Sequence, residues 1–407
     1  MPPTTAAPPA PTAARAQWTR TWTPRLVAFG EFIDGYDLLV MGAALLFLKP
    51  DFGLTADQTG RLGAIAFLGT AVGLVVFGDL SDRLGRKVIF VVNLALFVAV
   101  SLASAFVTEV WQLMAARFLI GVAVGMDIPT SHAFLAEIAP TARRGRIAGS
   151  LPNLMWLGGA ITSVLVALAL KPVAGDDTWR WLFGLAAPPA PAGRPSRSWR
   201  ALFTRRAGAR LAAVTAFFAL QAFGGAVATI AGPLVMESTG IGTEHALLFS
   251  LGGFTAGFLA VAAGARIIDR VNRRALGIAT CLGVFLAGLV LALAGRTGTP
   301  VLLTAYLCYA LLTWLGPGVL SWVWSSELFP TELRGLGSGI AQCVTRLMIA
   351  LNILLVPHLL DRFGLRAVAL YATAYALCAA VVAAAPFLAT TGRSLEELDA
   401  TAQREER

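Results

Sequence analysis

Long apolar runs follow one another along the chain, separated by short polar, basic or Pro/Gly-rich segments. The hydrocarbon core of a membrane is about 30 Å thick, so a helix that crosses it needs roughly 20 apolar residues. The runs of suitable length are 25–48, 60–80, 88–107, 111–136, 147–170, 211–236, 244–268, 275–295, 300–325, 336–358 and 365–389. A further stretch, from Trp179 to Gly193, has 15 residues and three prolines, which interrupt helices. The pattern predicts an all-α integral membrane protein with a short or broken sixth helix.

Composition and charge support a membrane protein with a defined orientation. The 407 residues are 57% hydrophobic and 14% charged, with a mean hydropathy of +0.72, which is unlike a soluble domain. The net charge of +9 comes from short basic loops, so it indicates a positive-inside topology and no nucleic-acid partner. We expect a multi-pass protein of the plasma (inner) membrane, embedded in the lipid bilayer, with both termini in the cytoplasm.

Two fragments recur in the second half of the chain. "DRLGRK" from Asp82 returns as "DRVNRR" from Asp269, and "EIAPTARRG" from Glu137 returns as "ELFPTELRG" from Glu327. Such a duplication predicts two similar six-helix bundles with a binding site between them, which is typical of secondary transporters. The expected organisation is a disordered tail (1–20), an N-terminal bundle (21–193), a basic cytoplasmic linker (194–210), a C-terminal bundle (211–390) and a cytoplasmic tail (391–407).

Several motifs carry a family resemblance, which extends from about Arg25 to Leu398. "GDLSDRLGRK" (78–87) resembles the loop signature G-x-L-x-D-R-x-G-R-K of the major facilitator superfamily and matches it at every specified position. "RFLIGVAVG" (117–125) is similar to the fourth-helix motif of that superfamily, and "TTGRSLEEL" (390–398) to the C-terminal signature of its sugar-porter branch. "DGYD" (34–37) resembles the first helix of proton-coupled aromatic-acid and metabolite symporters.

The resemblance implies a role for charged residues at the cytoplasmic ends of the helices. It implies that they form networks that latch the outward-open state and break as the two bundles rock. The expected gating residues, with their accompanying glycines, are Gly78, Asp82, Arg83, Gly85, Arg86, Glu137, Arg144, Asp269, Arg273, Glu327 and Arg334. The alternative is that these charges only set the topology.

Four charged residues within the apolar runs are candidates for proton coupling: Asp34, Asp37, Arg117 and Asp127. Asp34 and Asp37 are three residues apart on a helix, so both point toward the same face. A rise of about 1.5 Å per residue puts Asp37 and Arg117 at similar depths, which predicts that they pair. Protonation of Asp37 would then release Arg117 and change the relative energies of the two open states. The resemblance implies the same proton-carrying role for Asp37.

Each of these residues has a structural alternative. For Asp37 the alternative is a static salt bridge, and for Asp34 it is a hydrogen bond that packs helices instead of a proton or substrate contact. For Asp127, the functional interpretation is a role in gating or in the proton path, and the alternative is that of a buried structural partner.

Arg346 and several polar or aromatic side chains are candidates for substrate binding. A guanidinium near the bilayer midplane needs a partner for its charge. That partner is either a substrate carboxylate or, as the alternative, Asp34 or helix carbonyls. Gln221, Asn153 and Asn352 could bind substrate or bridge helices, and Trp156 and Trp322 could stack a ring or pack.

These observations favour a proton-coupled symporter that imports a small organic metabolite, a carboxylate or an aromatic acid. The alternatives are a porter of sugars or other solutes, an efflux antiporter, or a transporter-like sensor or damaged copy that no longer transports. We expect no cofactor, with the proton as coupling ion, and no metal, since each of the four cysteines lies alone in an apolar run. The chain carries no enzyme motif that fits a membrane helix, so we do not expect an enzyme.

Overall fold

The structure of the chain is a computed structural model, which describes the backbone of residues 13–84, 86–138, 145–185, 205–229, 243–294, 299–329, 334–392 and 397. Within these helices, the side chains of 13–28, 78–91, 127–138, 205–207 and 334–336, and a few single positions, lie outside the described part.

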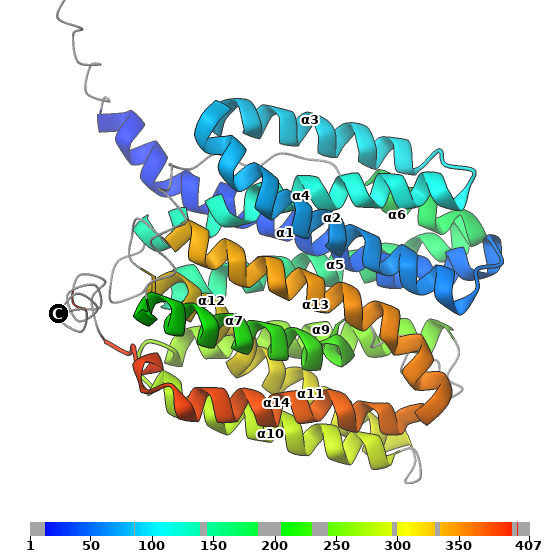
Figure 1. The fold of residues 1–407 in the computed structure, drawn as a ribbon. Coiled ribbons are helices and arrows are strands. Elements are labelled where there is room, and N and C mark those ends of the chain that lie inside the picture. The colour runs from blue at the N-terminus through cyan, green and yellow to red at the C-terminus, as the bar shows by residue number, and fades with distance from the viewer. Residues whose placement is uncertain are drawn as a thin grey trace, which may run out of the picture.

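The described chain is helical and forms two bundles that lie side by side, with most helices along one common axis (Figure 1). The first bundle contains α1 (Ala13–Asp51), α2 (Ala56–Leu84), α3 (Arg86–Ser104), α4 (Val110–Ile138), η2 (Gly145–Ser150), α5 (Leu151–Ala174), η3 (Gly175–Asp177) and α6 (Thr178–Gly184). The second contains α7 (Arg205–Gly225), η5 (Ala226–Ala228), α9 (Thr243–Ile267), α10 (Arg273–Ala294), α11 (Thr299–Thr313), η6 (Trp314–Gly318), α12 (Val319–Glu327), α13 (Arg334–Phe363), η7 (Gly364–Arg366), α14 (Ala367–Ala384) and η8 (Pro386–Leu388). Eight spans in the described part are long and apolar enough to cross a membrane, which confirms the predicted all-α, multi-pass architecture.

Two helices begin earlier than the predicted bundle limits. Helix α1 begins at Ala13, inside the segment 1–20 that we expected to be a tail, and α7 begins at Arg205, inside the expected linker 194–210. Both extensions are rich in Ala and Arg, which favour helices. A helix satisfies its own backbone hydrogen bonds, so it can continue beyond the apolar span.

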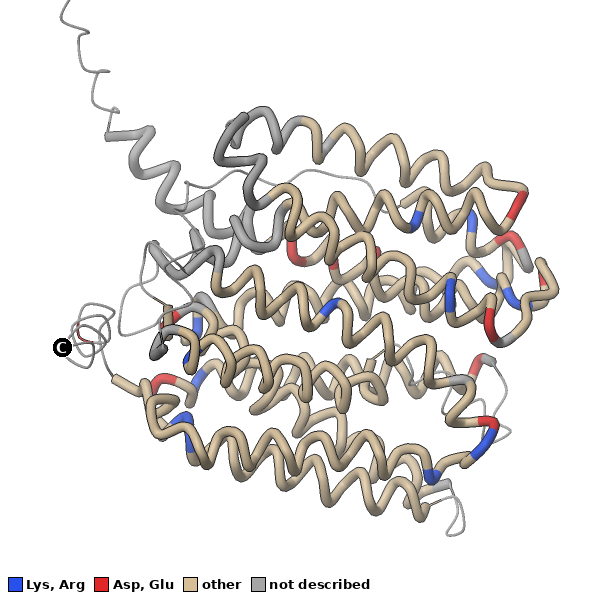
Figure 2. Tube along the Cα trace, in the orientation of Figure 1, with Lys and Arg blue, Asp and Glu red and all other residues tan. Residues whose placement is uncertain are grey.

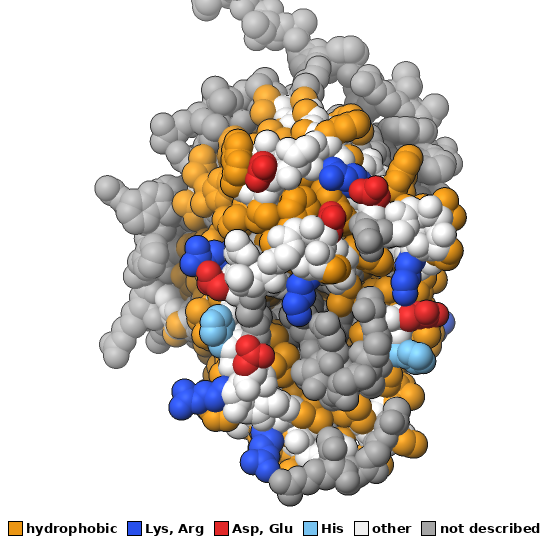
Figure 3. Space-filling model, turned by 90° about the vertical axis from the view of Figure 1, so that its right-hand side faces the viewer, with side chains coloured by type: hydrophobic (Ala, Val, Ile, Leu, Met, Phe, Trp, Pro, Cys, Tyr) orange, Lys and Arg blue, Asp and Glu red, His pale blue; other side chains and the backbone are white. Residues whose placement is uncertain are grey.

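Charged residues of the described chain gather at the two ends of the helices, with a few between them (Figure 2). Helix α1 begins and η8 ends at the same end of the molecule, which we call the terminal end (Figure 1). Figure 3 looks onto the opposite end, where acidic and basic side chains alternate over the face and apolar side chains cover the flanks. This distribution is that of a molecule whose middle lies in a hydrocarbon layer.

Helices α2 and α4 pack closely because small residues lie between them. A Cβ atom at Gly121 would clash with the carbonyl oxygen of Ala66, and one at Gly125 with that of Thr70. Glycines at an interface let helix backbones approach within a membrane. This close contact fixes the height of α4, and therefore of Arg117, one turn before Gly121.

Helix α7 ends at Gly225 in the middle of the second bundle. Side chains from other helices donate hydrogen bonds to its last carbonyl oxygens. Asn352 Nδ2 donates to the carbonyl oxygens of Ala222 (3.1 Å) and Phe223 (3.0 Å). Tyr309 donates its hydroxyl hydrogen to the carbonyl oxygen of Gly224 at 2.6 Å. Irregular backbone inside a membrane needs such internal partners.

Only Thr178–Gly184 of the sixth helix is described, so its predicted break stays a prediction. Helix α6 has seven residues, and the chain from 186 to 204 lies outside the described part. Two side chains fasten α6 to its neighbours at the end opposite the termini. Trp179 Nε1 donates to Asp51 Oδ2 at 3.0 Å, and an Arg180 nitrogen donates to the carbonyl oxygens of Ala105 (3.2 Å) and Val107 (2.7 Å).

Candidate functional site

A cavity of about 100 Å³ lies between the two bundles and is lined by residues of both. A buried water needs ~10–15 Å³ of such space, so the cavity has room for about seven to ten waters, or a small organic solute. Its charged and polar lining includes Glu31, Asp34, Asn153, Gln221, Thr229, Thr313, Ser321, Gln342, Thr345 and Arg346. Its aromatic lining consists of Phe67, Trp156, Phe218, Trp314 and Trp322. The mixture suits a solute with both polar groups and an apolar face.

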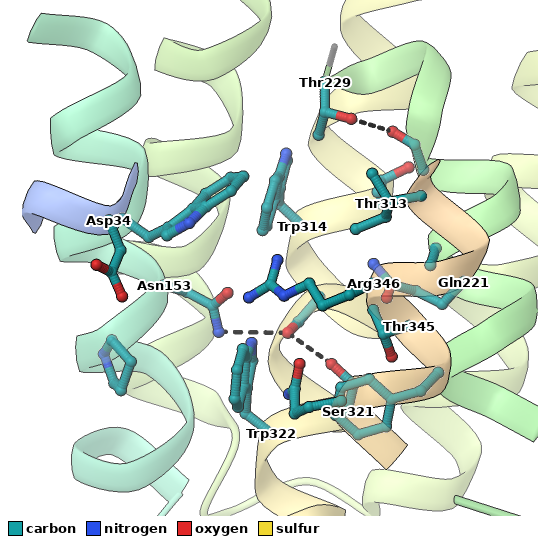
Figure 4. A pocket seen from close by; sticks show the side chains of 18 of the residues that line it. Asp34, Asn153, Gln221, Thr229, Thr313, Trp314, Ser321, Trp322, Thr345 and Arg346 are labelled. Atoms are coloured by element: carbon teal, nitrogen blue, oxygen red, sulfur yellow. Dashed lines mark hydrogen bonds between the residues drawn. The ribbon is translucent and has the colours of Figure 1, made fainter. Parts of the chain in front are cut away.

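Arg346 of α13 brings a positive charge into this cavity. Its guanidinium points between Trp314 and Trp322 toward the wall that carries Asp34 (Figure 4), and only 7% of the residue is exposed. The carboxylates whose negative charge acts on it are Asp34 and Glu31. Both belong to α1, so the anions that balance Arg346 come from the other bundle. Its Nε atom has no hydrogen-bond partner within the described part of the chain.

Other predicted binding residues lie around the same cavity. Gln221, Trp156 and Trp322 line it, and the ring of Trp156 packs on that of Trp314 with centroids 5.6 Å apart. Asn153 also lines it, and its Nδ2 donates to the carbonyl oxygens of Gly149 (2.7 Å) and of Gly318 in the other bundle (3.3 Å). Asn153 and Trp156 therefore contact both the cavity and the other bundle.

Asn352 lies elsewhere. It is absent from the cavity lining, and its amide group holds the end of α7 through Ala222 and Phe223. Of the two roles that the sequence allows for Asn352, the structure places it in the one that bridges helices.

Asp37 and Arg117 form a buried ion pair within the first bundle, as the sequence predicts. An Arg117 nitrogen donates to Asp37 Oδ1 at 3.1 Å, and a second donates to the carbonyl oxygen of Asp37 at 2.7 Å. Both side chains are 0% exposed. The ring of Phe183 on α6 lies 5.0 Å from the guanidinium carbon and covers the pair.

The two aspartates do not share one environment, which corrects the expectation that both point toward the same face. Asp34 lines the cavity, whereas Asp37 is turned toward α4 and is absent from the cavity lining. Three residues on a helix correspond to a rotation that falls about 60° short of a full turn. This difference in rotation is enough for Asp34 to face the cavity while Asp37 faces the interior of the first bundle.

A second ion network lies at the terminal end and includes three of the predicted gating residues. Arg273 donates to Glu327 Oε2 at 2.5 Å and to Asp269 Oδ1 at 3.0 Å. The two carboxylate oxygens of Asp269 accept the backbone N–H groups of Gly145 (3.0 Å) and Arg146 (3.3 Å), which belong to the first bundle. Asp269 therefore joins the bundles directly, by capping the start of η2.

The remaining predicted gating and coupling residues are not described in detail. Gly85 and Arg144 lie outside the described residues. Gly78, Asp82, Arg83, Arg86, Asp127, Glu137 and Arg334 lie on helices, but their side chains are outside the described part.

Several residues of the site were not predicted from the sequence, among them Glu31 and Phe183. Glu31 lies one helical turn before Asp34 and lines the same cavity, so its spacing could have indicated a third carboxylate. Phe183 is one of many aromatic residues in apolar runs, and no local pattern distinguishes it.

Two helical bundles with a polar cavity between them define a secondary transporter of the major facilitator fold. Residues 25–194 and 191–402 match the family described as "Sugar (and other) transporter". The chain therefore belongs to the sugar (and other) transporter family, within the sugar-porter branch of the major facilitator superfamily. It is a membrane transporter and not an enzyme.

Individual relatives show how far the similarity extends. A D-xylose transporter of Levilactobacillus brevis is 27% identical over 438 residues, covering 92% of this chain and 94% of the relative. A gentisate transporter of Corynebacterium glutamicum is 32% identical over 167 residues, covering 41% of this chain and 37% of the relative. The structure of the proton:xylose symporter XylE bound to 6-bromo-6-deoxy-D-glucose matches with a TM-score of 0.78 and 20% identity, covering 95% of this chain and 99% of that one. This last likeness confirms the fold.

Proposed function

We propose that the protein is a proton-coupled symporter that imports a small hydroxylated solute of the sugar class across the plasma membrane. The observation that carries the proposal is the buried Asp37–Arg117 pair, on the same helix as the cavity residue Asp34. Ionisable side chains in a membrane span are costly, and they commonly mark proton pathways. The D-xylose transporter and the proton:xylose symporter among the similar proteins support a sugar as the solute.

The geometry suggests how a proton would act on the cavity. Neutralisation of Asp37 weakens its attraction to Arg117, and α1 transmits the change because it carries both Asp37 and Asp34. The bundles contact each other at both ends. Asp269 caps η2 at the terminal end, and Lys171 lies 3.9 Å from Glu244 at the opposite end. A proton that biases one of these contacts against the other produces alternating access.

The orientation follows from the charges of the loops. The terminal end carries the basic segments that begin α7 and α10. Basic loops remain on the cytoplasmic side of a membrane, so we place both termini in the cytoplasm.

A hydroxylated aromatic acid is a second candidate for the solute. Arg346 lies in the cavity beside aromatic rings, and a guanidinium binds a carboxylate through two hydrogen bonds. The partial similarity to a gentisate transporter favours the same class of solute.

Uptake into proteoliposomes tests the proposal directly. Pentoses, hexoses, hydroxy acids and hydroxylated aromatic acids would be offered, each radiolabelled, with and without an imposed inward proton gradient. We expect gradient-dependent accumulation of at least one sugar. Accumulation of acids alone would favour the second candidate. A folded protein that accumulates nothing would indicate a sensor or a damaged copy, in keeping with the short or broken sixth helix that the sequence predicts.

Arg346→Gln tests the role of the positive charge in the cavity. Hydrogen bonds to charged groups contribute roughly 1.5–3 kcal/mol, so we expect the KM for the transported solute to rise at least about tenfold. The measurement is initial uptake rate against solute concentration. Arg362→Gln, an exposed arginine on the same helix, is the matched control and should leave KM unchanged. An unchanged KM in the Arg346 variant would show that the solute does not contact this charge.

A further inference from the structure

Helix α6 has a buried face that lies against the Asp37–Arg117 pair. Trp179, Leu182 and Phe183 of α6 are each 0% exposed. The Phe183 ring centroid lies 5.0 Å from the Arg117 guanidinium carbon. The face of an aromatic ring attracts a cation at this distance, most strongly where water is excluded.

Hydrogen bonds on both sides of Phe183 hold α6 in this position. The hydroxyl of Tyr36, the residue before Asp37, donates to the carbonyl oxygen of Leu182 at 3.1 Å. On the other side, Arg180 binds two carbonyl oxygens of the loop after α3 and stacks 4.2 Å from the Trp179 ring centroid. The ring is therefore positioned by Tyr36 of α1 and by the loop after α3, through contacts that do not involve the charge on Asp37.

The ion pair itself leaves hydrogen-bonding capacity unused. Asp37 Oδ2 and Arg117 Nε are buried and have no hydrogen-bond partner within the described part of the chain. Arg117 also donates to the backbone carbonyl of Asp37, a contact that protonation of the side chain does not remove. When the carboxylate is neutral, Arg117 retains two partners, this carbonyl and the ring of Phe183.

We propose that Phe183 is a positioning residue for proton coupling, which holds the Arg117 cation in place while Asp37 is protonated. This inference rests on the proposed function. The ring reduces the energetic penalty of neutralising Asp37, because the buried cation keeps a favourable contact.

The other charged and titratable groups near the pair are engaged elsewhere. Those of the described residues include Glu31, Asp34, Tyr36, Lys49 and Asp51 on α1, Asp177 and Arg180 at α6, Asp57 and Arg61 on α2, Glu109 before α4 and Lys171 on α5. Glu31 and Asp34 line the cavity, Asp51 accepts the indole N–H of Trp179, and Asp177 pairs with Arg180. The others lie at the end opposite the termini or, like Tyr36, bind backbone.

Phe183→Met removes the ring face while keeping much of the volume. Without the ring, Arg117 depends more on the ionised carboxylate of Asp37. Protonation of Asp37 therefore requires a lower pH. We expect the pH of half-maximal gradient-driven uptake to move about one unit toward acid. Phe183→Tyr keeps the ring and should restore the original profile. Phe217→Met removes a ring that is buried equally well in the second bundle, and it should leave the profile unshifted. An unshifted profile in Phe183→Met, or equal shifts in both Met variants, would overturn the proposal.

A stability cycle tests the same contact without transport. The Tm of the detergent-solubilised protein would be compared among the unmodified chain, Phe183→Met, Asp37→Asn and the double variant. We expect the loss of Tm from Phe183→Met to be about twofold larger in the Asp37→Asn background, because the ring is then a main partner of Arg117. Equal losses of Tm in both backgrounds would show that Phe183 only packs in the core and does not stabilise the Arg117 cation. If the cycle shows coupling but uptake ignores the proton gradient, the proposed function fails while the contact stands.

Discussion

Asp37→Asn is expected to abolish accumulation driven by a proton gradient and to preserve exchange of solute across the membrane. Asparagine has the shape of a protonated aspartate but cannot bind or release a proton. Arg117 would still contact the carbonyl of residue 37 and the ring of Phe183, so the bundle should keep its structure. A proton gradient of two pH units corresponds to about 2.7 kcal/mol, or roughly hundredfold accumulation for one proton per solute. The variant should lose all of it.

The measurement is the ratio of internal to external solute in proteoliposomes, with counterflow exchange as the second assay. Asp177→Asn is the control, since Asp177 lies in the same bundle and its carboxylate is largely exposed and pairs only with Arg180 among the described residues. It should accumulate solute normally. If Asp37→Asn still concentrates solute, Asp37 and Arg117 form a static salt bridge and the proton is carried elsewhere.

The fold and the main ion pair could be predicted from the sequence for clear physical reasons. The hydrophobic runs have to match the thickness of a membrane, so their positions are visible without a structure. The similar depths of Asp37 and Arg117 follow from the rise of a helix, and the 3.1 Å contact confirms that pairing. The repeat of "DRLGRK" as "DRVNRR" also pointed to Asp269 and Arg273, which meet in the network at the terminal end.

The details of the site depend on helix rotation and on contacts between distant segments. A rotation of about 60° decides that Asp34 enters the cavity and Asp37 does not, and hydrophobic periodicity is weak in helices that are apolar on most sides. The sequence allows Asn352 to bind either a solute or a backbone carbonyl. Its role depends on where α7 ends, because its amide group donates to the last carbonyl oxygens of that helix. Phe183 acquires its position through the contacts of α6 with α1 and α3, which are distant in the sequence, and with α5.

The duplicated motif also contains a residue whose role is local. Asn272 stands where the first copy has Gly85. Its side-chain oxygen accepts the backbone N–H groups of Arg274 (3.0 Å) and Ala275 (3.2 Å), which caps the start of α10. Thr391 accepts the N–H of Arg273 at 3.1 Å. The start of α10 is thus fixed, and with it the position of the Arg273 side chain.

Glu327→Ala is expected to produce the largest loss of stability. The side chains of Arg273 and Glu327 are 3% and 2% exposed, so removing the carboxylate leaves a buried cation whose one remaining charged partner among the described residues is Asp269. Breaking a buried ion pair typically costs about 3–5 kcal/mol. Thermal unfolding of the purified protein would measure the loss. Arg266→Ala, an exposed arginine near the end of α9 that binds only the carbonyl of Ala262 among the described residues, should change the Tm little.

A further pair of variants separates the stability of the network from its role in closing the terminal end. Replacing Arg273 and Glu327 together by Leu removes both charges, and it should recover part of the lost Tm. Asp269→Ala leaves the Arg273–Glu327 pair but removes the only described side-chain contact of the network with Gly145 and Arg146. We expect this variant to unfold near the original Tm while the bundles separate at the terminal end, measured as a longer distance between spin labels on either side. If the distance is unchanged, the cap on η2 does not hold the bundles together.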